Sequence, residues 1–199
     1  MQITHSMLPK LFASIVISLS LVACTPSLDW RTVRSDDLLY EALYPGKPSR
    51  AEKTIAFNGQ KLTMTMEASR VNDTLFAVGV INIPTTAKSI DLKALKDFLQ
   101  NGMLSNLKTE QKITPATISI KTAGQPSYDL PAQEWVIQGI GPDGQQRLLR
   151  FRVVQRNLPD GQIQIYQQSI LQVIKGTTPT EKILRSDEHE MFFTGFKPY

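Results

Sequence analysis

The fold class of this chain is decided by residues 54–68, which read TIAFNGQKLTMTMEA. Asn58-Gly59 is the preferred pair for a two-residue type I′ turn, because both central residues of that turn take positive φ. Such a turn places Ile55 opposite Leu62. Beyond the turn, the side chains alternate between one side, with Leu62, Met64, Met66 and Ala68, and the other, with Lys61, Thr63, Thr65 and Glu67. The pattern predicts a β-hairpin whose second strand is buried on one face only.

Two further elements are expected after the hairpin. Residues 71–74 predict another turn, and residues 75–83 (LFAVGVINI) are apolar on both faces, which indicates a strand in the middle of a sheet. Helical spacing replaces alternation in residues 90–107, where one stripe contains Leu92, Leu95, Leu99, Met103 and Leu107. We therefore expect an antiparallel meander and then a helix that Ser89 caps and whose first turn Asp91 favours.

The second half of the chain returns to strands, expected at residues 117–121, 134–140, 146–155 and 162–174. The last three are separated by two turn sequences, Gly141-Pro142-Asp143-Gly144 and Leu158-Pro159-Asp160-Gly161. Residues 179–193 then place apolar side chains on one face of a helix. The expected fold class is α+β, with a single antiparallel β-sheet, a mid-chain helix and a C-terminal helix packed on it, in one domain over residues 28–199.

Two stretches of the chain carry a resemblance to a known family. Residues 40–48 read YEALYPGKP and residues 191–197 read MFFTGFK. With the mid-chain helix and the later hairpins, they resemble the layout of the PsbP-like superfamily, the photosystem II extrinsic subunit and its bacterial relatives. The resemblance implies a sandwich fold and a non-enzymatic role in assembly or binding, and it supplies no catalytic residues. Residues 44–48 also resemble the start of envelope lipoproteins.

The N-terminus has the organisation of an export signal. Residues 1–10 are mildly basic without an acidic residue, and residues 11–23 form the apolar run LFASIVISLSLVA. A helix of that length spans about 20 Å, whereas a membrane-crossing helix must cover about 30 Å. We therefore expect a signal peptide at residues 1–23 that is removed from the mature protein.

The apolar run ends in Leu21-Val22-Ala23-Cys24, which resembles the lipobox of bacterial lipoproteins. Only a thiol can form the thioether to diacylglycerol, and a small residue at Ala23 suits the peptidase that would cut before Cys24. The alternative is a buried structural cysteine after an ordinary secretory signal. We expect lipidation because Cys24 ends the apolar run and is the only cysteine, so it has no disulfide partner.

The lipid determines the expected location. An N-acyl diacylglyceryl cysteine carries three chains, palmitate being the expected acyl type, so residues 24–27 would tether the domain permanently to a membrane. Thr25 rather than aspartate follows the cysteine, which by resemblance to enterobacterial sorting implies the outer membrane rather than the inner. The domain is then expected in the cell envelope, facing the periplasm.

Composition excludes several classes of chemistry. The chain has 22 Lys and Arg against 18 Asp and Glu, a net charge of +4, which is too small to indicate a nucleic acid partner. His5 lies in the signal, so the mature protein keeps one histidine, His189, which is expected on a solvated helix face. A histidine-rich zinc site and Cys–His catalysis are thereby excluded, and no metal or cofactor is expected.

Carboxylate catalysis stays open, because paired acids can meet in space from anywhere in a chain. The obvious pairs are Asp36 with Asp37 and Asp129 with Glu134. Exposed loops and strand ends explain the same residues without catalysis.

Two predicted strand faces offer binding chemistry. The alternation that turns residues 149, 151 and 153 inward sends the other side chains outward, namely Arg150, Arg152 and Arg156. Such a stripe can hold an anion bidentately, and Tyr166 on a neighbouring strand could add a stacking surface. The second face lies on that neighbouring strand and has hydrogen-bond donors with Tyr166 as an aromatic platform, which suits a glycan or peptide; its polar residues are Gln162, Gln164, Gln168 and Gln172. An ordinary solvated sheet is the alternative explanation for both patterns.

The leading hypothesis from the sequence is a lipid-anchored cell-envelope protein that acts as a non-catalytic binding or assembly factor. Its expected partners are the membrane, through Cys24, and an envelope protein, an anionic lipid or a glycan. The alternative is a carboxylate-dependent hydrolase acting on cell-wall or lipid material. A buried cleft with two carboxylates about 5 to 9.5 Å apart would favour the hydrolase, whereas a filled sandwich would favour binding.

Overall fold

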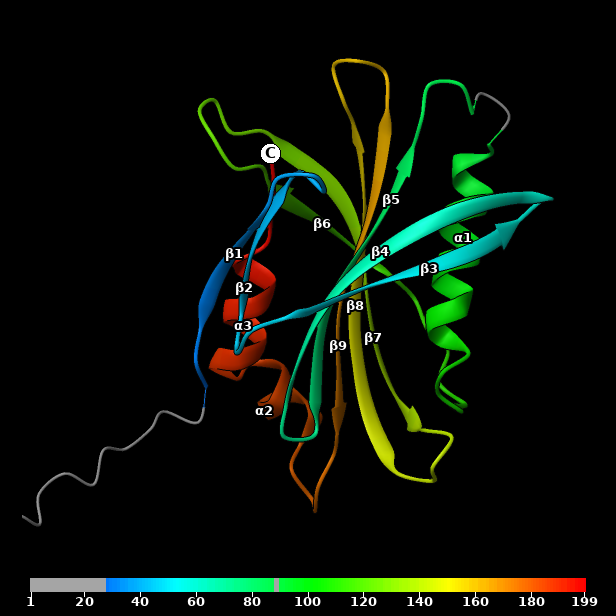
Figure 1. Ribbon diagram of the computed structural model, residues 1–199. Helices are drawn as coiled ribbons and strands as arrows, with labels where there is room; N and C mark the ends of the chain where they lie inside the picture. The colour runs from blue at the N-terminus through cyan, green and yellow to red at the C-terminus, as the bar shows by residue number, and fades with distance from the viewer. Residues whose placement is uncertain (1–27, 88–89) are drawn as a thin grey trace, which may run out of the picture.

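The computed structural model describes residues 28–87 and 90–199 (Figure 1). The expected signal peptide, Cys24, the tether at residues 24–27 and Ser89 lie outside the described residues. The strands are β1 (Arg31–Ser35), β2 (Tyr40–Tyr44), β3 (Ser49–Phe57), β4 (Gln60–Val71), β5 (Thr74–Ile83), β6 (Ala116–Lys121), β7 (Asp129–Ile140), β8 (Gln146–Asn157), β9 (Ile163–Val173) and β10 (Lys197–Pro198). The helices are α1 (Leu92–Leu104), α2 (Thr180–Leu184) and α3 (Asp187–Thr194). Within the described ranges, none of these helices has both the length and the apolar character needed to cross a membrane.

The strands form two antiparallel sheets. The larger has the order β3-β4-β5-β9-β8-β7-β6 and the smaller has the order β1-β2-β10. The predicted antiparallel strands are confirmed, but the domain is mostly β with few helices rather than evenly α+β, and the expectation of a single sheet is wrong. The small sheet leaves little trace in the sequence, because β1 contains one apolar residue, Val33, and β10 is only two residues long.

Each face of the large sheet has its own apolar core. On one face α1 packs against the sheet through a cluster that includes Leu95, Leu99, Trp135, Phe151 and Ile165. On the other face the small sheet and α3 form a cluster that includes Tyr40, Tyr44, Phe76, Phe192 and Phe193. The domain therefore has three layers, with the large sheet between α1 and the layer of β1, β2 and α3 (Figure 1).

The hairpin at Asn58-Gly59 is confirmed. Asn58 and Gly59 have φ values of 46° and 77°, and Ile55 pairs with Leu62. β5 lies between β4 and β9, as expected for a strand that is apolar on both faces. The start of α1 differs from the prediction, because Asp91 is the N-cap rather than a first-turn residue.

Gly59→Val should lower the free energy of unfolding by about 1 to 2 kcal/mol, because a β-branched residue resists the positive φ of this turn. Gly59→Asn is the matched control, since asparagine tolerates that conformation, and it should stay close to the wild type. Thermal unfolding followed by circular dichroism measures both. An unchanged midpoint in Gly59→Val would contradict a conformational role for the glycine.

The C-terminal segment forms two short helices rather than the single expected one. α2 ends at Leu184, and Ser186 caps α3 by accepting a hydrogen bond from the backbone nitrogen of His189 at 3.5 Å. His189, Phe192 and Phe193 share one face of α3 through their i, i+3 and i+4 spacing, and all three are buried.

Candidate functional site

Arg150 and Arg152 extend from β8 on the face that α3 covers, so the expectation that they stand on an open face is wrong. Their side chains are 16% and 13% exposed. Glu134 of β7, which pairs with Arg152 across the strands, accepts hydrogen bonds from Arg150 at 3.1 and 3.2 Å and from Arg152 at 2.5 Å. One carboxylate thus serves two guanidinium groups, and the cluster keeps one uncompensated positive charge.

Phe193 of α3 closes this arginine cluster. The guanidinium carbons of Arg150 and Arg152 lie 4.3 and 4.5 Å from the centre of its ring, a cation–π distance. Arg152 also donates a hydrogen bond to the Phe193 carbonyl oxygen at 3.0 Å, and burial lowers the pKa of this arginine. Arg156 instead donates to the carbonyl oxygen of Tyr199. The three arginines therefore hold the C-terminal segment on the sheet.

Tyr166, Gln164 and Gln168 of β9 lie on the same covered face, whereas Gln162 precedes β9 and is exposed. Tyr166 is fully buried and donates a hydrogen bond to the carbonyl oxygen of Leu39 at 3.0 Å, and burial raises its pKa to about 12. Gln164 and Gln168 are buried as well. The expectation of an open platform for a glycan or peptide is wrong at Tyr166, Gln164 and Gln168, because the segment between β1 and β2 and helix α3 cover these side chains. Gln172, farther along β9, lines a pocket.

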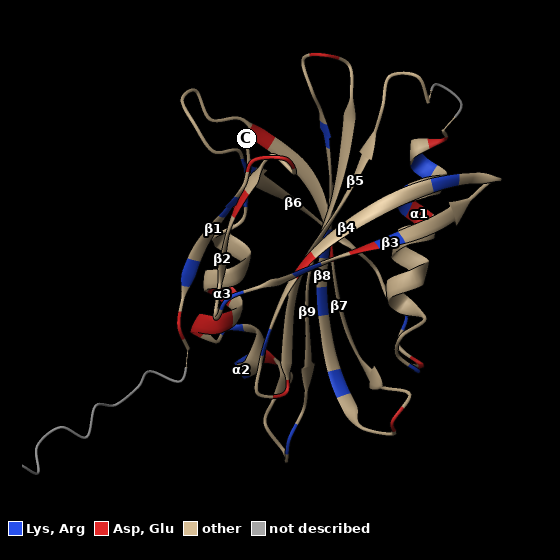
Figure 2. Cartoon of the chain, in the orientation of Figure 1, with Lys and Arg blue, Asp and Glu red and all other residues tan. Residues whose placement is uncertain are grey.

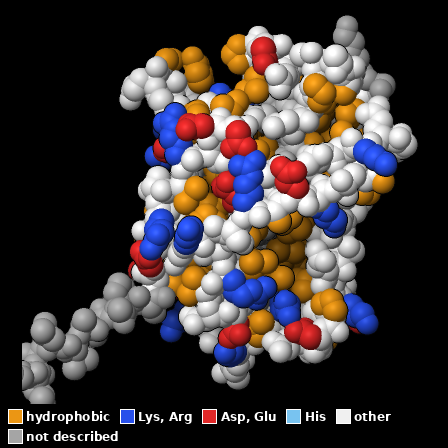
Figure 3. Space-filling view, viewed as in Figure 1, with side chains coloured by type: hydrophobic (Ala, Val, Ile, Leu, Met, Phe, Trp, Pro, Cys, Tyr) orange, Lys and Arg blue, Asp and Glu red, His pale blue; other side chains and the backbone are white. Residues whose placement is uncertain are grey.

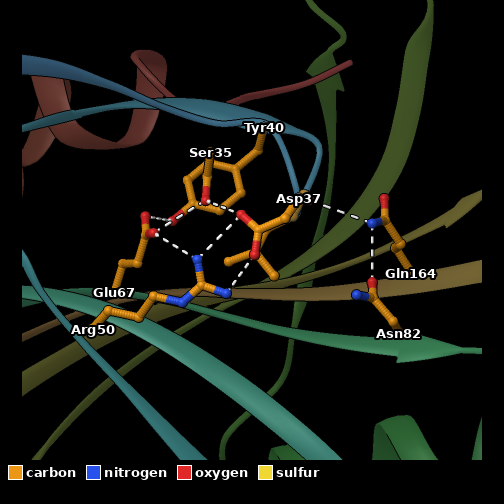
Figure 4. Close-up of polar contacts among 8 residues, drawn as sticks. Ser35, Asp37, Tyr40, Arg50, Glu67, Asn82 and Gln164 are labelled. Atoms are coloured by element: carbon orange, nitrogen blue, oxygen red, sulfur yellow. Dashed lines mark hydrogen bonds and ion pairs between the residues drawn. The ribbon is translucent and has the colours of Figure 1, made fainter.

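A buried polar network holds the small sheet against β4 (Figure 4). Glu67 accepts hydrogen bonds from Ser35 at 3.0 Å and from Tyr40 at 2.5 Å. Arg50 lies 3.9 Å from the same carboxylate and also pairs with Asp37. The expectation that Glu67 lies on the exposed side of a half-buried strand is wrong, because the β1–β2 hairpin covers this part of β4.

The acidic residues considered for catalysis are engaged elsewhere or exposed. Asp36 pairs with Arg34, and Asp37 pairs with Arg50; these arginine hydrogen bonds lower the pKa of each carboxyl group. Asp129 is exposed at the start of β7. In residues 28–87 and 90–199, no group of His, Cys, Asp and Glu side chains is arranged to hold a metal ion.

A pocket of about 520 Å³ opens at one end of the sheet, between the β4–β5 turn, the end of β9 and the two C-terminal helices. Its apolar wall is made by Leu28, Val71, Phe76, Val173 and Ile183. Figure 1 shows that the described chain begins at this end of the molecule, near α2. These residues are far apart in the sequence, which is why no sequence pattern indicates the pocket.

His189 supplies the buried polar group of the pocket wall and is 1% exposed. Its Nε2 lies 2.9 Å from the Oε1 of Gln172, whereas its Nδ1 has no hydrogen-bond partner among the described residues. Burial lowers the pKa of His189 to about 4; the Arg150 charge acts in the same direction, and Glu188 opposes it. The expectation of a solvated histidine is therefore wrong.

The surface of the domain carries mixed charge. Basic and acidic residues are distributed over strands, helices and loops (Figure 2), and on the face shown in Figure 3 they are scattered among hydrophobic side chains. No single charged patch dominates that face. The pocket at His189 is the candidate functional site because an apolar wall and the polar side chains of Gln172 and His189 meet in it.

Two comparisons with known proteins found no match to this chain. No protein-family model matches the chain, and no curated protein sequence matches it. The candidate site is therefore defined by the geometry of the pocket and of the residues that line it.

Proposed function

We propose that this chain is a lipid-anchored cell-envelope protein whose domain is a non-catalytic binding or assembly factor. The observation that supports the proposal best is the position of Leu28 in the pocket wall. Leu28 is the fourth residue after Cys24, and four residues span at most about 14 Å in any conformation. A lipid on Cys24 would therefore hold the pocket close to the membrane surface.

The polar clusters support binding over hydrolysis. A glycoside hydrolase of the usual type needs one carboxyl group to protonate the leaving group and a second as nucleophile or base. Glu67 and Glu134 are two buried or half-buried candidates, and both are held by hydrogen bonds from neighbouring side chains. They lie outside the lining of the pocket, whose own carboxylates are those of Glu188 and of Asp73, which pairs with Lys175. The hydrolase on cell-wall or lipid material is thus the weaker alternative.

Kinship with the PsbP-like superfamily stays a prediction from the sequence. It would fit the same proposal, because that resemblance implies a non-enzymatic assembly or binding role. The outer-membrane address is likewise proposed from Thr25 alone.

Lipidation at Cys24 is the first test. We expect the wild-type protein in the membrane fraction, with an N-terminus that begins at Cys24 and carries the mass of a diacylglyceryl group and one further acyl chain. Cys24→Ala should lose that mass and should no longer be processed before residue 24. Ser27→Ala is the matched control and should behave as the wild type. Mass spectrometry of the mature N-terminus measures all three, and an unmodified Cys24 in the wild type would contradict the anchor.

Density-gradient separation of the inner and outer membranes tests the proposed location of the protein in the outer membrane. The wild type should sediment with the outer membrane, and Thr25→Asp should move toward the inner membrane. Recovery of the wild type in the inner membrane would refute the proposed location. It would not contradict the proposal that Cys24 is lipidated.

A further inference from the structure

Strand β3 forms an open edge of the large sheet (Figure 1). It is nine residues long, and among the described strands it pairs only with β4, in an unbroken register. All of its residues are exposed except Ile55 and Phe57. Within residues 28–87 and 90–199, no backbone hydrogen bond outside the β3–β4 ladder involves this strand. One row of its backbone donors and acceptors therefore faces outward.

The turn at Asn58-Gly59 determines which backbone groups face outward. In a two-residue hairpin the residues that flank the turn form a hydrogen-bonded pair, and such pairs alternate along the strands with pairs that share no hydrogen bond. Phe57 and Gln60 flank this turn and face each other. The residues of β3 that direct their N–H and C=O groups away from β4 are therefore Arg50, Glu52, Thr54 and Ala56.

The two edges of the large sheet are protected to different degrees. Proteins usually protect a sheet edge with a short strand, a proline, a bulge, a covering segment or charged side chains. The opposite edge strand, β6, has six residues, and Ala123 just beyond it donates a backbone hydrogen bond to Pro198 of β10 at 2.7 Å. β3 is longer than the typical strand of about five or six residues and has neither a proline nor a bulge. Only charged side chains protect it.

The charges of β3 restrict how a second copy of the same strand could pair with it. Two copies can run antiparallel about a twofold axis that passes through one residue position. An axis at Glu52 or at Lys53 would place two like charges directly opposite each other, which is destabilising. An axis at Thr54 places two threonines opposite each other, which is a favourable pair. Thr54 is thus the centre that the charges permit.

The alignment centred on Thr54 is also the longest that avoids facing like charges. It pairs residues 51–57 of each copy, whereas a centre at Ala51 or at Ile55 would pair only residues 49–53 or 53–57. Arg50 lies outside the paired segment and can keep its ion pair with Asp37.

Side-chain size fits the same alignment. Ala51 of one copy lies opposite Phe57 of the other, so a small side chain faces a large one. Phe98 of α1 is 43% exposed, and its ring lies 5.6 Å from the ring of Phe57. The added strand therefore runs beside an aromatic pair that is still partly open to solvent.

We propose that β3 is a self-association edge, at which two copies of this chain join antiparallel with Thr54 on the twofold axis. Backbone hydrogen bonds from the outward-facing residues then connect the two large sheets into one, as in other cases of strand addition. The inference goes beyond the proposed binding role and does not depend on a lipid at Cys24.

Disulfide cross-linking of the full chain tests the alignment. Facing residues of a hydrogen-bonded pair have Cα atoms about 5.5 Å apart, within reach of a disulfide. After mild oxidation, Thr54→Cys should give a covalent dimer on a non-reducing gel, well above the wild type, whose only cysteine, Cys24, sets the background.

Glu52→Cys is the matched control for Thr54→Cys, because Glu52 is exposed on the same strand and also directs its backbone outward. In the proposed alignment Glu52 faces Ala56, so the two copies of position 52 are offset by about 13 Å along the strands. Glu52→Cys should therefore stay at the background level. A Glu52→Cys dimer as strong as that of Thr54→Cys, or no dimer above background in Thr54→Cys, would overturn the proposal.

Sedimentation equilibrium in a density-matched detergent measures the association without a cross-link. Thr54→Pro is tolerated in the monomer because its lost N–H points to solvent on an edge strand. In the dimer it removes two hydrogen bonds, one from each copy, and should weaken association about tenfold or more. Thr54→Val keeps the N–H and should associate like the wild type. A monomeric wild type, or equal association of the two variants, would refute the pairing edge.

Discussion

Glu134→Ala should lower the free energy of unfolding by about 3 to 5 kcal/mol, the loss typical of removing one partner from a buried ion pair. The side chain of Glu134 is 13% exposed and is the shared acceptor for Arg150 and Arg152. Without it, two guanidinium groups would remain beneath the ring of Phe193 with no carboxylate between them. Urea unfolding at pH 7, followed by circular dichroism, measures the change.

Two further variants separate this effect from a general loss of charge. Asp97→Ala breaks an exposed ion pair with Lys93 on α1 and should have little effect, as surface pairs do. Adding Arg150→Met to Glu134→Ala should recover part of the stability, because it removes one of the two uncompensated charges. A Glu134→Ala loss no larger than that of Asp97→Ala would show that the arginine cluster does not stabilise the fold.

His189→Gln should remove a large part of the acid sensitivity of the protein. The folded-state pKa of about 4 lies below the ordinary value of 6.5, so the unfolded chain takes up the proton first. Stability is therefore lost as the pH falls from about 6.5 to about 4, and each pH unit in that window is worth about 1.4 kcal/mol. The wild type should lose about 3 kcal/mol there that the glutamine variant keeps.

The measurement is urea unfolding of both proteins at several pH values between 7 and 4. Glutamine keeps an amide that can bond to Gln172 but has no proton to gain in this range. The carboxylates titrate in both proteins, so the difference between the two curves reports on His189. Parallel curves would mean that the histidine is already accessible to protons in the native state.

Local geometry made part of this fold predictable. Asn58-Gly59 selects its turn through the φ values of two adjacent residues, and the register of Ile55 with Leu62 follows from that turn alone. Apolar character on both faces placed β5 inside the sheet. The spacing of Leu95 and Leu99 marked the buried face of α1.

The candidate site was not predictable in the same way. Alternation tells which side chains share a face of a strand, but not whether another layer covers that face. Arg150 and Tyr166 were assigned to the correct side of their strands, yet α3 and the small sheet bury that side. Glu67 illustrates the same limit, because the β1–β2 hairpin that covers it is distant in sequence.

The sequence by itself determined the strand order of the meander, the turns, the mid-chain helix and the expectation of a lipid at Cys24. Each of these depends on residues that are neighbours in the chain. The tertiary structure alone decided that His189 is buried, that Arg150 and Arg152 share Glu134, and that Leu28, Phe76 and Ile183 meet in one pocket wall. Burial and pocket formation depend on which distant segments pack together, and that is a property of the whole fold rather than of any stretch of it.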